Sequence, residues 1–133
     1  MSLTQAEADE LLSMPKIFVD LAPLELSTME PIDYDRELRS VDRREGFLLT
    51  IERGRRNRAR LKYQTRARKV IILARLDLNA ARHRNPPESP YKPDEWLSET
   101  HLHLYREGFE DRVAYELNDA PGWGDPQVAI LCD

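Results

Sequence analysis

The sequence predicts an α+β fold in which an N-terminal helix packs on a twisted, mostly antiparallel sheet that could curl into a partial barrel. Three observations favour it: a capped amphipathic segment opens the chain, several short β-rich segments follow, and turn residues separate those segments. At 133 residues the chain has the length of one domain, and we expect residues 1–133 to share a single core.

The first predicted element is a helix over residues 4–14. Thr4 and Glu7 have the spacing of a capping box, and Leu11 lies on the apolar face of the helix that would follow. Pro15 ends this helix, because proline lacks an amide proton and disfavours the helical conformation in the residue before it.

The middle of the chain, residues 23–117, is expected to form the antiparallel sheet. Residues 47–53 are rich in β-forming side chains, and residues 69–78 are apolar on both sides in their first half, as in a strand covered on both faces. Residues 58–66 alternate apolar with mostly cationic side chains, and the turn residues at 54–57 make them the hairpin partner of 47–53. The other expected strands are 24–27, 34–41, 101–106 and 112–117.

A long loop over residues 79–100 interrupts the predicted sheet, because four prolines lie within eight positions of it. Long ordered loops in compact domains are often functional. Residues 118–133 form a C-terminal segment, whose apolar part, 127–133, fits either a helix or a strand. Trp96 and Trp123 lie among loop residues, and we expect both to cover a small core.

Positive charge is concentrated in residues 53–69, which hold nine of the 20 lysines and arginines and no acidic residue. The rest of the chain therefore carries 11 cations against 24 acids. Such polarisation favours an anionic partner, so we predict a nucleic-acid-binding module that contacts RNA or DNA phosphates through this hairpin. The alternative is that these cations pair with acids of the same chain or of a protein partner. The candidate binding residues are Arg55, Arg56, Arg58, Arg60, Lys62, Arg66 and Arg68.

Two of the three histidines lie one residue apart in the segment THLHLYREGF, residues 100–109. On a strand, His101 and His103 would share one face with Tyr105, while the intervening leucines would face the core. The third histidine, His83, lies at the start of the Pro-rich loop that leads into this strand, and could fold back over the pair.

One use of these histidines is metal binding. Three imidazoles would supply a three-nitrogen site with an open position, as catalytic zinc requires. The spacing His-x-His-x3-Glu, which ends at Glu107, is similar to the first motif of cupins. However, Glu95 and Ala114 stand where that motif has glycines, and no second motif with another histidine follows.

The second use is general acid–base cleavage of RNA, which needs two imidazoles and a nearby cation such as Arg106. The third use is structural, with the histidines on a solvent-facing strand whose leucines enter the core. We assign no metal and no cofactor. The catalytic hypothesis comprises His83, His101, His103 and Tyr105.

Three segments, RKVIILARLDL (68–78), HRNP (83–86) and HLHLYREGF (101–109), resemble an uncharacterised family of small bacterial and mobile-element proteins. That family has similar segments in the same order: R-K-x-x-x-L-x-R-L-D, H-x-N-P and H-L-H-x-Y-x-E-G. The likeness covers about residues 45–117 and brings no established activity. It implies an origin in a prophage or another mobile element, and a single constellation of His83, Asn85, His101, His103, Tyr105 and Glu107.

No apolar run approaches the roughly 20 residues of a membrane span, and the first 30 residues lack the layout of a signal peptide. We therefore expect a cytoplasmic protein that makes no contact with a membrane. The single cysteine, Cys132, cannot form a disulfide within the chain. A protein-interaction module of the antitoxin or immunity type is a further alternative function.

Overall fold

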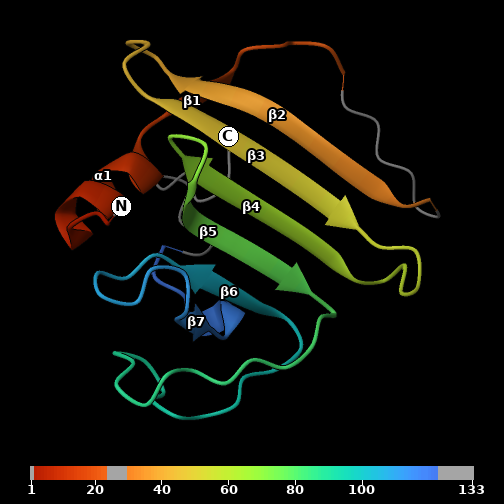
Figure 1. The fold of residues 1–133 in the computed structure, drawn as a ribbon, viewed down its shortest axis with the longest axis vertical. Coiled ribbons are helices and arrows are strands. Elements are labelled where there is room, and N and C mark those ends of the chain that lie inside the picture. Colours follow the sequence, from red (N-terminus) through yellow and green to blue (C-terminus); the bar gives the residue numbers. More distant parts are fainter. Residues whose placement is uncertain (1, 24–29, 123–133) are drawn as a thin grey trace.

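The computed structural model describes residues 2–23 and 30–122. Within these residues, one α-helix precedes seven strands, which form a single antiparallel sheet in the order in which they occur along the chain (Figure 1). The elements are α1 (Gln5–Ser13), β1 (Lys16–Phe18), β2 (Ile32–Ser40), β3 (Gly46–Arg53), β4 (Leu61–Ala67), β5 (Ile71–Leu78), β6 (His101–Leu104), β7 (Ala114–Tyr115) and the short 3-10 helix η1 (Leu117–Asp119). The predicted α+β class is confirmed.

Helix α1 begins at the predicted capping box. The Thr4 hydroxyl accepts a hydrogen bond from the Glu7 amide at 3.1 Å, and the Glu7 carboxylate accepts one from the Thr4 amide at 3.0 Å. The helix ends at Ser13, two residues before Pro15, as expected. Its buried residues, Ala8 and Leu11, join the core of the sheet.

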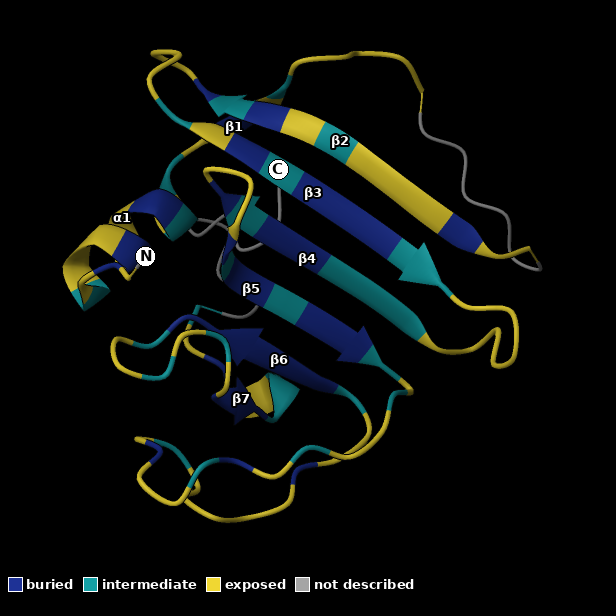
Figure 2. Cartoon of the chain, viewed as in Figure 1, coloured by how far each residue is buried: buried dark blue, intermediate teal, exposed yellow. Residues whose placement is uncertain are grey.

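The two faces of the sheet differ in chemistry. Directly paired residues of neighbouring strands share a face, so the row Leu38, Phe47, Ala67 and Ile71 belongs to the apolar face on which α1 packs. The opposite face is polar: one row joins Thr50, Gln64, Arg75 and His103, and the next joins Glu52, Lys62, Asp77 and His101. Both faces of β5 and β6 are largely buried, whereas much of β2 is exposed (Figure 2).

The structure corrects several sequence-based expectations about the sheet. The sheet is not closed, and β1 and β7 form its edges. Strand β4 begins at Leu61, and therefore residues 58–60 belong to the preceding loop. Residues 16–18, for which no element was predicted, pair with β2 as strand β1. The segments expected at 24–27 and 127–133 lie outside the described residues.

The two C-terminal strands are shorter than predicted. Strand β6 ends at Leu104, and β7 comprises only Ala114 and Tyr115. Tyr105 therefore lies beyond the strand on which the sequence placed it. In the described part of the chain, no helix is long and apolar enough to cross a membrane.

Candidate functional site

Strands β5 and β6 place four polar side chains next to one another on the polar face of the sheet. Asp77 pairs directly with His101, and Arg75 pairs directly with His103. Because side chains alternate along a strand, residues two apart point to the same side, and all four meet there. We call Arg75, Asp77, His101 and His103 the histidine cluster.

Backbone carbonyls orient both imidazoles of the cluster. His101 Nδ1 lies 2.8 Å from the Ser98 carbonyl oxygen, and His103 Nδ1 lies 2.9 Å from that of Asp111. A carbonyl oxygen only accepts, so each Nδ1 carries a proton and donates it. The two Nε2 atoms then point at the same carboxylate oxygen, Asp77 Oδ2, from 3.3 Å and 3.5 Å.

Arg75 supplies the positive charge of the cluster. Its Nε lies 3.1 Å from Asp77 Oδ1, and its Nη1 lies 3.5 Å from the Asp111 carboxylate. Its Nη2 lies 2.9 Å from His103 Nε2, to which it donates a hydrogen bond. The neutral form of His103 therefore has both ring nitrogens satisfied.

The Pro-rich loop brings the third histidine onto the cluster. The His83 ring centroid lies 4.6 Å from that of His103 and 5.8 Å from that of His101. His83 Nε2 donates to the Arg112 carbonyl at 2.9 Å. The three histidines singled out in the sequence therefore converge at one place in the structure.

Asn85 fixes the loop that carries His83. Its amide nitrogen donates to the carbonyls of Tyr91 and Ala114 at 2.9 and 3.0 Å, and its oxygen accepts from the Ala114 amide at 2.9 Å. The side chain is buried and ties the loop to β7. Asn85 therefore positions His83 indirectly.

The expectation of a solvent-facing histidine strand is wrong. His101 is 1% exposed and His103 is 2% exposed, whereas His83 is half-buried. Leu102 and Leu104, which alternate with the histidines, are buried as well, as predicted. Beneath the Pro-rich loop, β6 is therefore covered on both sides.

Tyr105 and Glu107 lie apart from the histidine cluster and hold the N-terminus. The Tyr105 hydroxyl donates to the Leu3 carbonyl at 3.0 Å and accepts from the Leu3 amide at 2.6 Å. Glu107 accepts from the Gln5 amide at 2.7 Å. The residues that the family resemblance implies as one constellation therefore form two groups. The three histidines come together beside β5 and β6, whereas Tyr105 and Glu107 contact the N-terminal segment.

Burial and charge set the protonation of the cluster. Burial disfavours the ionised Asp77, but hydrogen bonds from both histidines and the charge of Arg75 outweigh it and hold the pKa of Asp77 well below its usual range. Burial lowers the pKa of His103, which the hydrogen bond with Asp77 opposes. Burial also lowers the pKa of His83. The site therefore has an ionised carboxylate close to two imidazoles of reduced basicity, those of His83 and His103.

The arginine-rich hairpin does not present one cationic face. Arg55, Arg56, Arg58 and Arg60 lie together in an exposed loop between β3 and β4, residues 54–60, which we call the tip loop. Lys62 and Arg66 lie on β4, and Arg68 directly follows the last residue of β4, at the end away from the tip loop. Lys62 pairs with Glu52 at 3.7 Å, Arg66 donates to Thr50 at 2.9 Å, and Arg68 pairs with Glu45 at 3.3 Å.

The structure changes the role expected of Trp96, which lies on the Pro-rich loop. Trp96 is 55% exposed, so its expected role as a cover for the core is wrong. The guanidinium groups of Arg82 and Arg84 lie 5.8 and 6.0 Å from its ring centroid. The Asn79 side chain donates to the Ala59 carbonyl at 2.9 Å and joins the start of the Pro-rich loop to the tip loop. The signal in the sequence was the alternation of Arg82 and Arg84 before the first proline.

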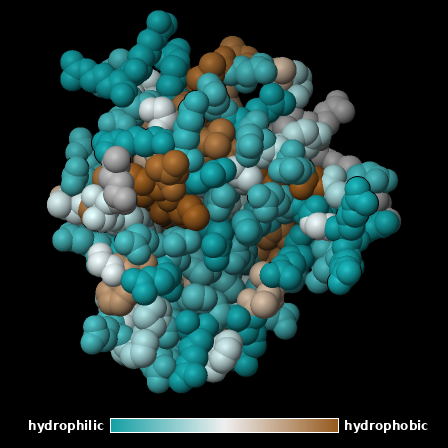
Figure 3. Space-filling model, in the orientation of Figure 1, coloured by the Kyte–Doolittle hydropathy of each residue, from teal (hydrophilic) through white to brown (hydrophobic). Residues whose placement is uncertain are grey.

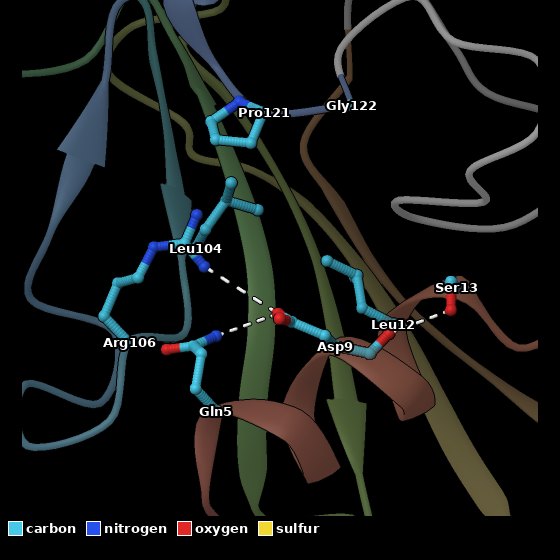
Figure 4. A pocket seen from close by; sticks show the side chains of 8 residues that line it. All are labelled: Gln5, Asp9, Leu12, Ser13, Leu104, Arg106, Pro121 and Gly122. Atoms are coloured by element: carbon cyan, nitrogen blue, oxygen red, sulfur yellow. Dashed lines mark hydrogen bonds and ion pairs between the residues drawn. The ribbon is translucent and has the colours of Figure 1, made fainter.

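Two hollows lie on different sides of the sheet. One, of about 270 Å³, extends from Gly54, Arg60 and Lys62 of the tip-loop region to Asp77 of the histidine cluster. The other, of about 440 Å³, lies beside α1, where Asp9 contacts Gln5 and Arg106, and Leu12 and Leu104 add apolar side chains to the lining (Figure 4). The first hollow therefore connects the cationic loop with the histidine cluster.

The geometry defines a small α+β protein with a histidine cluster under a Pro-rich loop and a cationic loop beside it. The chain belongs to a family of unknown function, DUF6978, whose family model matches residues 3–127. The family resemblance of the sequence is thereby confirmed, while a bacterial or prophage origin stays a prediction. No curated protein and no solved structure matched the chain in the same comparisons.

Proposed function

We propose that this protein binds nucleic acid, with the tip loop as its main contact for phosphates. A cytoplasmic location, expected from the sequence, is part of this proposal. The observation that carries it is the exposure of four arginines within seven residues, none of which forms an ion pair with a carboxylate of residues 2–23 or 30–122. Free guanidinium groups bind phosphate by two parallel hydrogen bonds and release counterions from the nucleic acid.

The backbone of the tip loop is ordered by side chains. Asn57 accepts a hydrogen bond from the Ala59 amide at 3.1 Å, and Asn79 binds the Ala59 carbonyl. An ordered loop loses less conformational entropy on binding than a flexible one. This supports a preformed contact surface.

Trp96 supports single-stranded nucleic acid as the ligand. An exposed indole flanked by two guanidinium groups offers a surface on which a base can stack, and such stacking contributes about 1–3 kcal/mol per base. The hollow beside Trp96 also contains Lys92 and Asn79. Its carboxylates include Glu116, which is engaged by the amide and hydroxyl of Ser98.

A pair of matched variants tests the proposal. Arg55→Gln/Arg56→Gln removes two charges from the tip loop, and Arg43→Gln/Arg44→Gln removes two exposed charges from the turn between β2 and β3. In fluorescence anisotropy with a labelled single-stranded RNA at low salt, we expect the first variant to weaken binding by about fivefold or more and the second by less than about twofold. Equal losses would contradict a specific role of the tip loop, and absence of binding by the wild type would contradict the proposal itself.

Trp96→Ala provides a second arm of the same experiment. Loss of one stacked base is expected to weaken the binding of single strands by about tenfold while leaving that of double strands little changed. An unchanged affinity for single strands would show that Trp96 does not contact the nucleic acid. The tip-loop variants test the role of the tip loop independently of this result.

Ribonuclease-type cleavage is the alternative that the convergence of the three imidazoles favours. Against it, His101 and His103 are buried, and their ring nitrogens are engaged by carbonyls, Asp77 and Arg75. A general base must reach the proton that it removes. Incubation of the protein with labelled RNA in the presence of a chelator tests this alternative, and we expect intact RNA. The protein-interaction alternative stays a prediction.

A further inference from the structure

We propose that Asp77, His101 and His103 bind a divalent transition-metal ion, with Asp77 Oδ2 and the two Nε2 atoms as ligands. This inference goes beyond nucleic-acid binding and does not depend on it. The three ligand atoms lie within 4.8 Å of one another, on two neighbouring strands whose register places them together.

The distances within the cluster fit tetrahedral coordination. Zinc binds imidazole nitrogen and carboxylate oxygen at about 2.0–2.2 Å, so the edge of its coordination tetrahedron measures about 3.3–3.5 Å. Asp77 Oδ2 lies 3.3 Å from His101 Nε2 and 3.5 Å from His103 Nε2. The two distances from Asp77 Oδ2 therefore match the separation between ligands of one tetrahedral metal ion, and the third ligand pair lies within 4.8 Å.

The same distances are long for hydrogen bonds between the imidazoles and the carboxylate. A charge-assisted hydrogen bond between imidazolium and carboxylate is about 2.7–2.9 Å long. With both Nδ1 protons committed to backbone carbonyls, each histidine can donate to Asp77 only as an imidazolium; in the neutral form its Nε2 lone pair faces the carboxylate. Arg75 Nη2 compensates for this at His103, from whose Nε2 it lies 2.9 Å, and a cation between His101 Nε2 and Asp77 Oδ2 would stabilise the rest of the arrangement.

Hydrogen bonds around the cluster have the form that metal sites use. A ligating histidine typically donates its other ring nitrogen to a carbonyl or carboxylate, which fixes the ring and raises its basicity. Both histidines do this, toward Ser98 and Asp111. The hollow that reaches Asp77 gives an ion a path from solvent and leaves a coordination position for water or an anionic ligand.

Arg75 competes with the metal in this scheme. Its Nη2 donates to two of the proposed ligand atoms, His103 Nε2 at 2.9 Å and Asp77 Oδ2 at 3.3 Å, and would have to withdraw when they bind an ion. Its bonds from Nε to Asp77 Oδ1 and from Nη1 to Asp111 can persist, since they use other atoms. Removing this charge with Arg75→Gln is therefore expected to tighten metal binding by about tenfold or more.

The test uses the full chain without a polyhistidine tag, stripped with a chelator and titrated with Zn²⁺ by calorimetry. We expect one ion per chain, and a loss of affinity of about tenfold or more in Asp77→Asn, His101→Gln and His103→Gln. The matched control is Asp111→Asn, which removes the other carboxylate that faces Arg75 but no ligand. Absence of saturable binding by the wild type, or unchanged affinity in all three ligand variants, would overturn the proposal.

A measurement on the wild type keeps the test decisive if a variant does not fold. Long-range ¹H–¹⁵N spectra resolve the ring nitrogens of the three histidines. On addition of Zn²⁺, the Nε2 signals of His101 and His103 should shift while both Nδ1 atoms keep their protons and His83 Nε2 stays in place. Unchanged Nε2 signals, or a shift confined to His83, would contradict the assigned ligands.

Discussion

At the scale of single residues, Tyr105 joins parts of the protein that are far apart in the sequence. Its hydroxyl bonds both the amide and the carbonyl of Leu3, and the ring is buried in the core beneath α1. The adjacent Glu107 accepts from the first turn of the helix. The sequence grouped Tyr105 with the histidines, but these contacts show that its side chain attaches helix α1 to the sheet.

Tyr105→Phe is expected to destabilise the protein by about 1–3 kcal/mol, because it leaves two buried backbone groups of Leu3 without a partner. Urea unfolding followed by circular dichroism measures the loss. Tyr34→Phe, at a surface-exposed tyrosine of β2, is the control and should change stability by less than about 0.5 kcal/mol. Equal effects of the two substitutions would contradict the role assigned to the hydroxyl of Tyr105.

Tyr91 makes the stability of the protein sensitive to alkaline pH. Burial and the hydrogen bond from its hydroxyl to Asp119, 2.7 Å long, raise the pKa of Tyr91 to about 12. A folded-state pKa above the unfolded value means that this contribution to stability is fully present below about pH 10 and is lost as the pH rises toward 12. Tyr91→Phe should therefore flatten the fall in unfolding free energy between pH 10 and 12. A fall as steep as in the wild type would contradict this linkage.

At the scale of elements, helix α1 shows what local sequence determines. Its start depends on Thr4 and Glu7, which bond each other's backbone as the sequence predicted. Thr4→Ala is expected to reduce stability by about 1 kcal/mol, whereas Thr4→Ser, which keeps the hydroxyl, should be nearly neutral. Thermal unfolding of the two variants measures this difference, and identical midpoints would contradict it.

Strands β3 and β5 could be predicted because their side chains are those of buried strands, but the boundaries of β4 could not. Arg58 and Arg60 continue the alternation of β4, yet the Asn57 turn keeps them in the tip loop. The turn from β4 to β5 places Arg68 and Lys69 at positive φ, 53° and 67°, without a glycine to signal it. Such turns depend on the pairing of their strands, which local sequence does not encode.

The candidate site could be predicted in part. The histidines were found from their spacing, and their convergence followed from the Pro-rich loop. Asp77 and Arg75 were missed because their meeting with the histidines depends on the register of β5 and β6, a tertiary property. A carboxylate inside an otherwise apolar strand, as in RLDL at 75–78, was the available signal, since a buried charge requires a partner.

At the scale of the whole molecule, positive charge is concentrated in the exposed tip loop. In the view of Figure 3, the surface is mostly hydrophilic and its hydrophobic side chains are gathered in separate patches. The formal net charge is −4, so overall electrostatics do not attract a polyanion, and the proposed binding would have to come from the local concentration of arginines. The distribution of charge therefore predicts binding at one site on the molecule and weak binding elsewhere.

The dependence of nucleic-acid affinity on salt tests this account most directly. With up to four arginines contacting phosphates of a single strand, the logarithm of the binding constant should fall with the logarithm of salt concentration with a slope of about −2 to −3. In the variant in which Arg55, Arg56, Arg58 and Arg60 are all replaced by glutamine, the slope should approach zero. A wild-type slope near zero, or the same slope in both proteins, would contradict the account.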